Sequence, residues 1–286
     1  MQKTAIEYLK GPDGKEGYSW SPIKMRCSPI SAGCANCWHL RFAKRHAANP
    51  TFGERNRAAY AGSPPRLDLK ELSEPHNRRK PARIAVQFMG DLFHDGVLDD
   101  VIDQVFAVMA TAQQHTFLVL TKRPERMRRY LGDGSYDSHR RIQVWNAKVH
   151  ARGKPVSPMD WPLKNVWMGV SAENQETADK RIPLLIETPA AVRWVSVEPM
   201  LGPVDFRDVP RGACLPCGPG DRFGGVIPKG IGWIVYGAET GHGRRDMDAR
   251  WALSLRGQCQ EAGVLSFGKV DSEGRPLMPR EMPCPR

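Results

Sequence analysis

The sequence predicts an α/β fold built on a partial barrel of parallel strands. Between residues 83 and 270, short apolar runs alternate with helical segments, which is the pattern of repeated βα units. Each run is continuous, as in residues 117–120, and this is expected of strands that are covered on both faces. Charged or amide side chains follow successive runs, which is where site residues lie at the carboxyl edge of a parallel barrel.

The elements follow from these runs in order. The predicted strands are 84–88, 117–120, 166–170, 192–195, 231–235 and 264–267. The predicted helices are 38–46, 99–113, a short one after Pro124, one through Leu185, and 248–262. Right-handed βαβ connections curl such units into a barrel or a doubly wound sheet.

The remaining residues are expected to be connections around a single domain, 1–286. Residues 1–26 look irregular, except for a short strand at 23–26 that leads into a cysteine-rich loop. Residues 49–81 form a long connector, so 1–82 holds the loop and connector and 83–270 the repeats. Insertions are expected near 133–162 and 202–230, and 271–286 is a tail.

Composition narrows the class of protein. The chain has 286 residues, 41% hydrophobic and 26% charged, as in a soluble globular protein. No signal peptide or membrane span is evident, so a cytoplasmic location is expected, or the host cytoplasm for a phage-encoded chain. The formal net charge of +11 favours a polyanionic partner, nucleic acid first.

Cys27, Cys34 and Cys37 have Cys-x6-Cys-x2-Cys spacing, and they are the strongest candidates for metal ligands. Three thiolates from one loop suit a soft metal or an iron–sulfur cluster, and three protein ligands leave one position open. The alternative is a zinc site completed by His39, Cys214 or Cys217. The spacing alone leaves both open.

The other cysteines permit a second metal site. Cys214 and Cys217 have the two-residue gap of a metal knuckle within a Gly/Pro-rich insertion. Cys259 falls in a helical pattern, where a buried reduced thiol is the simpler interpretation, and Cys284 lies near the end of the chain.

Polar residues after the strands are the other candidate site residues. They are Asp91, His94, Lys122, Arg123, Glu173, Asn174, Glu198, Glu239 and Lys269. A separate basic cluster, Arg78, Arg79, Lys80 and Arg83, either contacts phosphate or is simply solvated.

The order of cysteine loop and βα repeat resembles that of radical S-adenosylmethionine (SAM) enzymes. The closer resemblance is to a phage-associated subfamily with this loop spacing, and it covers roughly residues 18–270. Its motifs are Cys27 through Trp38, Gly90-Asp-Leu-Phe-His94, Leu120-Thr-Lys-Arg-Pro124, Gly169-Val-Ser-Ala-Glu-Asn174, Ser196-Val-Glu-Pro199 and Gly237-Ala-Glu-Thr-Gly241. The chain departs from the common Cys-x3-Cys-x2-Cys loop in its first gap, and Asn36 replaces the usual aromatic before the last cysteine.

The resemblance implies a fold of the radical SAM type, similar to a TIM barrel, that holds a [4Fe–4S] cluster. The three cysteines would bind three irons, leaving the fourth to chelate the amino and carboxylate groups of SAM. An external donor supplies the electron that cleaves SAM into methionine and a 5′-deoxyadenosyl radical. Glu198 is then expected to bind the ribose, with Ser171 and Asn174 as alternatives, and Trp38 to pack on adenine. Lys122 or Arg123 is expected to pair with the methionine carboxylate of SAM or with a substrate phosphate. Asp91, His94 and Glu239 are the candidate catalytic residues.

Two functions follow from these features. The first is a radical SAM enzyme that modifies a nucleobase in phage-type DNA, with isomerisation of a modified thymidine as the reaction we consider. The second is a zinc-stabilised nucleic-acid-binding protein without catalytic activity. The second uses the same cysteines and charge, but it does not explain why charged residues follow the strands.

Overall fold

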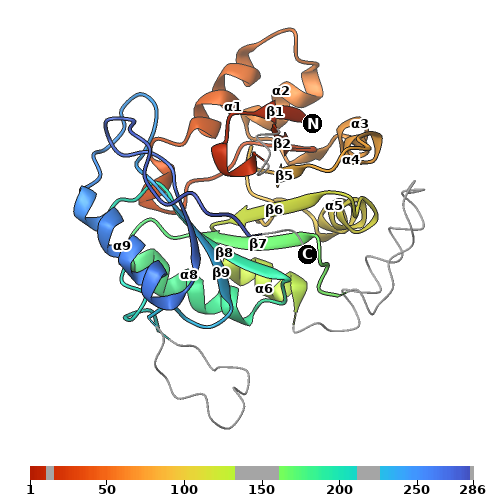
Figure 1. Ribbon diagram of the computed structural model, residues 1–286. Helices are drawn as coiled ribbons and strands as arrows, with labels where there is room; N and C mark the ends of the chain where they lie inside the picture. Colours follow the sequence, from red (N-terminus) through yellow and green to blue (C-terminus); the bar gives the residue numbers. More distant parts are fainter. Residues whose placement is uncertain (11–15, 133–160, 211–225, 284–286) are drawn as a thin grey trace.

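The computed structural model describes residues 1–10, 16–132, 161–210 and 226–283. Its centre is an eight-stranded sheet that curls into a half-barrel (Figure 1). The strand order is β1-β2-β5-β6-β7-β8-β9-β10, and every pairing is parallel except that of β1 with β2. The strands are β1 Gln2–Thr4, β2 Gly17–Trp20, β5 Arg83–Val86, β6 Thr116–Thr121, β7 Val166–Ser171, β8 Val192–Val197, β9 Ile231–Tyr236 and β10 Leu265–Gly268. The predicted α/β class and parallel curled sheet are confirmed.

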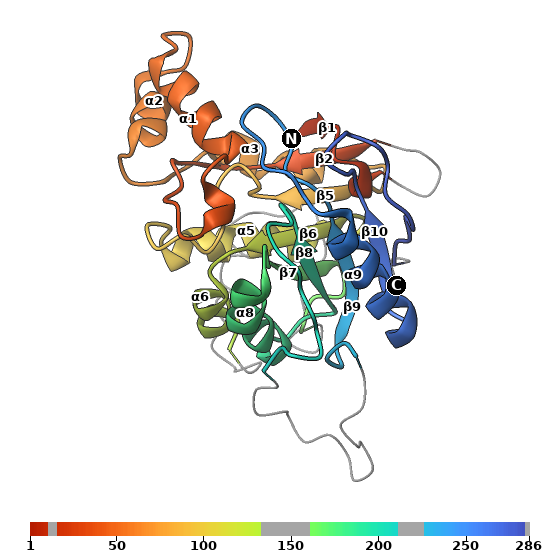
Figure 2. The same ribbon diagram turned by 90° about the vertical axis from the view of Figure 1, so that its left-hand side faces the viewer.

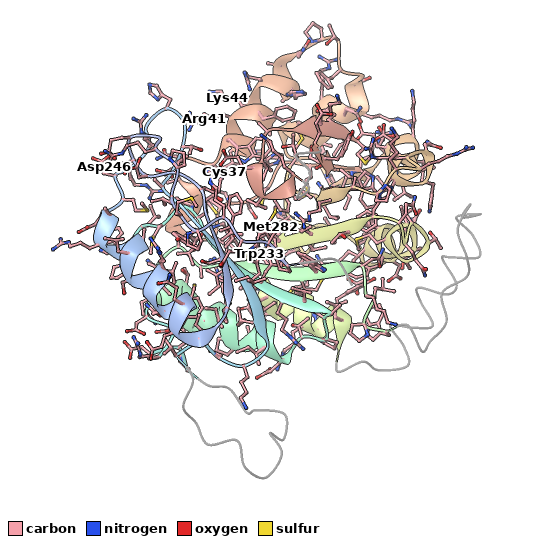
Figure 3. The ribbon with its side chains drawn as sticks, in the orientation of Figure 1. Cys37, Arg41, Lys44, Trp233, Asp246 and Met282 are labelled. Atoms are coloured by element: carbon pink, nitrogen blue, oxygen red, sulfur yellow. The ribbon has the colours of Figure 1, made fainter. Side chains whose placement is uncertain are left out.

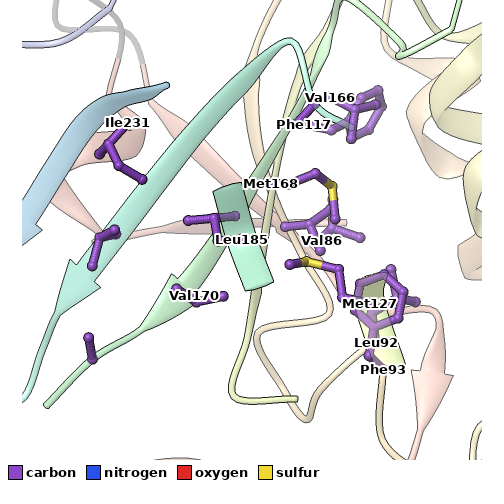
Figure 4. Close-up of a cluster of buried hydrophobic side chains, with 14 of the residues drawn as sticks. Val86, Leu92, Phe93, Phe117, Met127, Val166, Met168, Val170, Leu185 and Ile231 are labelled. Atoms are coloured by element: carbon purple, nitrogen blue, oxygen red, sulfur yellow. The ribbon is translucent and has the colours of Figure 1, made fainter. Parts of the chain in front are cut away.

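Helices that follow the strands cover the outer face of the sheet (Figure 2). They are α5 Asp99–Thr111, α6 Pro124–Leu131, α8 Gln175–Glu187 and α9 Ala249–Ala262. Asp248 caps the start of α9, and Gly263 ends it in the left-handed conformation at φ 64°. Alternate side chains of the strands, such as Met168 and Val170 of β7, pack against these helices (Figure 4).

The inner face of the sheet is filled by tryptophans at its amino end. Trp167, Trp194 and Trp233 are buried there, and Tyr8 of the short 3-10 helix η1 (Glu7–Leu9) packs on the last two. A Cβ atom on Gly169 would lie 2.4 Å from the Trp194 ring, so glycine is needed to admit the indole. Because these apolar side chains fill the amino end of the inner face, its polar side chains lie at the carboxyl end.

Two predictions about the first eighty residues are wrong. Residues 1–26 are not irregular: they supply β1, η1 and β2, and β2 is the first parallel strand. The strand β3 (Ile23–Lys24) leads into the cysteine loop as expected, but it pairs with β4 (Arg66–Leu67) in a separate two-stranded sheet. The expected connector also contains helices: α2 Glu54–Ala61, α3 Leu69–Leu72 and α4 Glu74–Asn77.

Helix α1 (Trp38–Ala48) begins directly after Cys37 and pairs with α2 beside the sheet (Figure 2). Phe42 of α1 contacts Tyr60 of α2 with ring centroids 5.9 Å apart, and His39 and Ala43 are buried on the same side. The opposite side of α1 is exposed. Among the described residues, no helix is both long enough and apolar enough to cross a membrane.

Candidate functional site

The cysteine loop, residues 27–37, lies against the carboxyl edge of the sheet. Arg123, which follows β6, donates to the carbonyl oxygen of Ser28 at 3.1 Å and to its hydroxyl at 2.9 Å. Glu173, which follows β7, accepts a hydrogen bond from the hydroxyl of Ser31 at 2.7 Å. Two strand ends therefore hold the segment between the first two cysteines.

The segment after β9 holds the other end of the loop. Asn36 donates from its amide to Glu239 at 3.0 Å and to the carbonyl oxygen of Gly243 at 2.6 Å. Arg245 makes a two-pronged ion pair with Glu239 and donates to the carbonyl oxygen of Ala32 at 3.1 Å. These hydrogen bonds, with Arg245 first, lower the pKa of Glu239 to about 2. Glu239 is thus an ionised acceptor that fixes the loop, which favours a positioning role over the predicted catalytic one.

Cys27 faces a buried ion pair. The Sγ atom of Cys27 lies 3.9 Å from Nη1 of Arg123, and that guanidinium also donates to Asp91 at 3.1 Å. Burial, with the Asp91 charge, raises the pKa of the Cys27 thiol to about 11, while Arg123 opposes the rise. Metal binding would remove this proton, since the thiolate is the ligand.

Cys34 and Cys37 lie near the ammonium group of Lys122. Burial alone would raise the pKa of Cys34, but backbone hydrogen bonds at Ile30 and Ser31 together with Lys122 lower it. Burial and then the Arg181 charge lower the pKa of Lys122 to about 8, against the attraction of Cys34 and Cys37. Lys122 is thus a cation close to Cys34, and a nearby cation favours the thiolate form.

Glu173 joins these cations behind the loop. Its buried carboxylate pairs with Lys122 on one oxygen and with Nη1 of Arg181 at 3.0 Å on the other. A Cβ atom on Gly33 would lie 2.3 Å from the Glu173 Oε1 atom, so the loop backbone passes directly over the carboxylate. A buried carboxylate between two cations is a structural support for the loop.

Asp91 connects the ends of β5 and β6. It accepts hydrogen bonds from the Thr121 hydroxyl at 2.7 Å, from the backbone N–H of Lys122 at 3.1 Å, and from the backbone N–H of Phe93 at 3.0 Å. With the Arg123 bond described above, both oxygens are occupied. The predicted catalytic role of Asp91 is therefore less well supported by its contacts than a positioning role.

His94 contacts the loop from the same side. Its Nε2 atom lies 2.8 Å from the hydroxyl of Ser28, the residue after the first cysteine. Burial and the nearby Arg123 charge lower the pKa of His94, so its imidazole is neutral at pH 7. The backbone N–H of Gly96 points at Nδ1 at 3.1 Å and that of Ser28 at Nε2 at 3.3 Å, so both ring nitrogens lie opposite backbone donors.

Comparison with known proteins places this site in a family. A family model described as "Protein of unknown function (DUF5131)" matches residues 4–273. The chain belongs to the DUF5131 family. No curated protein and no solved structure matches it. The matched range includes the cysteine loop and every strand from β2 to β10.

The residues expected to bind SAM in this DUF5131 protein lie at the same edge, with different local partners. Glu198, after β8, forms an ion pair with Lys269, after β10. Asn174 caps α8 in a capping box with Thr177. Ser171 ends β7, paired with Ser196 in register, and its carbonyl oxygen accepts from Arg181. Among the described contacts of the predicted site carboxylates, Glu198 has only the Lys269 partner, whereas Asp91, Glu173 and Glu239 each have several.

Trp38 is the first residue of α1 and is 54% exposed. Its ring meets those of His39 and Phe42 edge-on, at centroid distances of 6.1 and 6.4 Å. One face of the indole is therefore available to a ligand beside the cysteine loop.

Within the described ranges, no group of three His, Cys, Asp or Glu side chains is placed to hold a metal ion. Burial lowers the pKa of His39 to about 4, although a hydrogen bond with the Met25 backbone opposes this shift. Burial raises the pKa of the Cys259 thiol to about 12. Cys214, Cys217 and Cys284, with the predicted second metal site, lie outside the described residues.

Sequence reasoning missed the residues that hold the loop. They are Ser28, Ser31, Gly33, Asn36, Arg181 and Arg245, and Glu173 was noted only as a polar residue after a strand. Each lies inside a motif, except Arg245, which is four residues beyond the motif that ends at Gly241, and Arg181, for which the sequence carried no signal. Arg83 of the expected basic cluster is buried and donates to the Lys10 and Pro283 carbonyl oxygens, so its predicted exposure is wrong.

Proposed function

We propose that this DUF5131 protein is a radical SAM enzyme with a half-barrel of the radical SAM type. One observation carries the proposal: the loop with three cysteines is fixed to the carboxyl edge of a curled parallel sheet by Arg123, Glu173 and Glu239. In parallel barrels this edge is the catalytic one. A structural zinc knuckle would not need to be attached to three strand ends.

The cofactor fits the residues present. Cys27, Cys34 and Cys37 would hold a [4Fe–4S] cluster, with Arg123 and Lys122 offsetting the thiolate charge. When bound, the cluster supplies the electron, received from an external donor, that cleaves SAM and yields the 5′-deoxyadenosyl radical. The chain itself would orient SAM: Trp38 is available to adenine. Glu198, after β8, is available to the ribose and methionine groups, with Ser171 and Asn174 at or just after the end of the neighbouring strand β7.

The substrate we propose is a modified nucleobase in DNA, with an isomerisation or rearrangement as the reaction. The net charge of +11 supports a polyanionic substrate. Radical hydrogen abstraction opens carbon-skeleton rearrangements that acid–base chemistry does not. An isomerase of a modified thymidine is the specific form of this proposal.

Metal analysis of anaerobically purified protein tests the enzyme class. We expect about four iron and four sulfide per chain and SAM-dependent formation of 5′-deoxyadenosine. One zinc per chain with no iron after reconstitution would overturn the proposal and support the zinc-stabilised nucleic-acid-binding protein instead.

Glu198→Gln is expected to weaken SAM binding with the cluster intact. A neutral amide is a poorer acceptor than a carboxylate, and the loss of a charged hydrogen bond costs about 1.5–3 kcal/mol, or roughly 10- to 150-fold in affinity. Equilibrium dialysis of the iron-loaded protein measures it.

Lys269→Met is the matched control, because it also removes the ion pair with Glu198 but keeps the carboxylate. We expect SAM affinity to be retained in Lys269→Met. Equal losses in both variants would show that the ion pair, and not a ligand contact, is what matters.

A further inference from the structure

Helix α1 carries a face of unpaired cations next to the cysteine loop. Lys44 and Arg45 follow Arg41 by three and four residues, and all three are exposed on the side of α1 opposite its contact with α2. Among the residues that the structure describes, none of these three pairs with a carboxylate, and α1 contains no acidic residue. We refer to Arg41, Lys44 and Arg45 as the α1 basic face.

Exposed cations elsewhere on the molecule are of two kinds. Arg207 pairs with Glu261, Arg250 with Asp248, Arg275 with Asp271, and Lys180 with Glu176. Other exposed cations, such as Arg79, Lys80 and Arg129, have no carboxylate partner among the described residues. The α1 basic face is therefore distinguished by its place beside the cysteine loop, where its positive potential acts on the site.

The α1 basic face leads to the cysteines. Figure 3 shows Lys44, Arg41 and Cys37 in succession along the start of α1. Arg41 donates to the carbonyl oxygen of Asn36 at 3.1 Å and to that of His242 at 3.0 Å, so it also joins α1 to the loop after β9. That loop adds exposed Arg244 beside one exposed carboxylate, Asp246.

The basic cluster predicted from the sequence lies at the other edge of the sheet. Arg79 and Lys80 directly precede β5, and the Arg78 guanidinium lies 4.1 Å from the ring centre of Tyr18 at the start of β2. Both strands run from there toward the cysteine loop. Phosphates held at Arg79 and Lys80 would therefore lie a strand length away from the thiols.

We infer that the α1 basic face binds the phosphates of a DNA strand that flank a base presented to the cysteine loop. The phosphates that flank a base in DNA lie within one nucleotide of that base. The cations that bind these phosphates must therefore lie on the same side of the sheet as the cysteine loop. Enzymes that act on a base use single-stranded or extruded nucleotides, which such a track beside the site would hold. This inference rests on the proposed nucleic-acid substrate, whereas the placement of the cations does not.

The test is DNA binding measured against salt. Fluorescein-labelled single-stranded DNA is titrated with full-length protein at several salt concentrations. Lys44→Glu/Arg45→Glu is compared with Arg79→Glu/Lys80→Glu, which changes net charge by the same amount at exposed positions. Arg41 is left intact because it also supports the loop.

Each lost phosphate contact lowers the slope of log K against log salt by about 0.7 for a single strand, so the α1 variant should lose about 1.4. The Arg79/Lys80 variant should retain the wild-type slope. Equal losses in both, or an unchanged slope in the α1 variant, would overturn the inference, since either shows that net charge alone or another surface binds the strand.

Iron content and 5′-deoxyadenosine formed without DNA separate the two proposals. A protein that binds DNA through Lys44 and Arg45 but holds no iron would keep this inference and lose the enzyme. A protein that cleaves SAM but shows no salt-dependent DNA binding would keep the enzyme and lose this inference.

Discussion

Cys34→Ala should abolish iron retention and SAM cleavage while leaving the half-barrel folded. Cys34 is the middle of the three cysteines and lies in the loop, in the 3-10 helix η2 (Ala32–Cys34), outside the strands that form the core. Without Cys34, the cluster would keep only two of its three thiolate ligands, and we expect it not to assemble. Iron and sulfide analysis after anaerobic reconstitution measures the loss, and far-ultraviolet circular dichroism checks the fold.

Cys259→Ala is the matched control for a buried cysteine. Cys259 packs in α9 at the outer face of the sheet and contributes to the hydrophobic core. Its removal should lower stability slightly and leave the iron content unchanged. Full iron and full turnover in Cys34→Ala would contradict the assignment of the loop, and iron loss in Cys259→Ala would show that the assay reports folding instead of ligation.

The parallel part of the sheet could be predicted because each strand is a continuous apolar run. The strands β5 to β10 all lie within two residues of the predicted bounds. The strands β1 and β2 could not be predicted in this way, because they have only three and four residues and β2 begins at a glycine, Gly17. They are strands because β2 finds a parallel partner in β5, and that tertiary contact leaves no local signal.

The sequence could predict which segments meet at the candidate site, but not which residues contact one another there. Polar residues after parallel strands must share one edge, and Arg123, Glu173 and Glu239 do contact the cysteine loop there. Their partners were not predictable, because the loop reaches them through backbone carbonyls and small side chains such as Ser28 and Ser31. Such contacts depend on the path of the loop in space, which the spacing of cysteines does not determine.

Glu173→Gln should destabilise the apoprotein and loosen the cysteine loop together. The Glu173 side chain is 1% exposed, and its partners Lys122 and Arg181 are 19% and 7% exposed. Removing the charge leaves two largely buried cations without their shared carboxylate, and breaking a buried pair in this way costs about 3–5 kcal/mol. Chemical denaturation of the apoprotein measures the loss, and iron content after reconstitution should fall with it.

Glu176→Gln is the control on the same helix, since Glu176 pairs with Lys180 on the exposed side of α8. An exposed pair contributes little, so its loss should leave both denaturation and iron content close to wild type. A second variant, Gly33→Ala, separates the loop from the ion pair: its Cβ would lie 2.3 Å from Glu173 Oε1, displacing the loop while the carboxylate remains. We expect Gly33→Ala to lower iron content with a smaller loss of stability than Glu173→Gln. Wild-type stability in Glu173→Gln would mean that Lys122 and Arg181 do not need the carboxylate in the apoprotein, and Glu173 would no longer be the support of the loop.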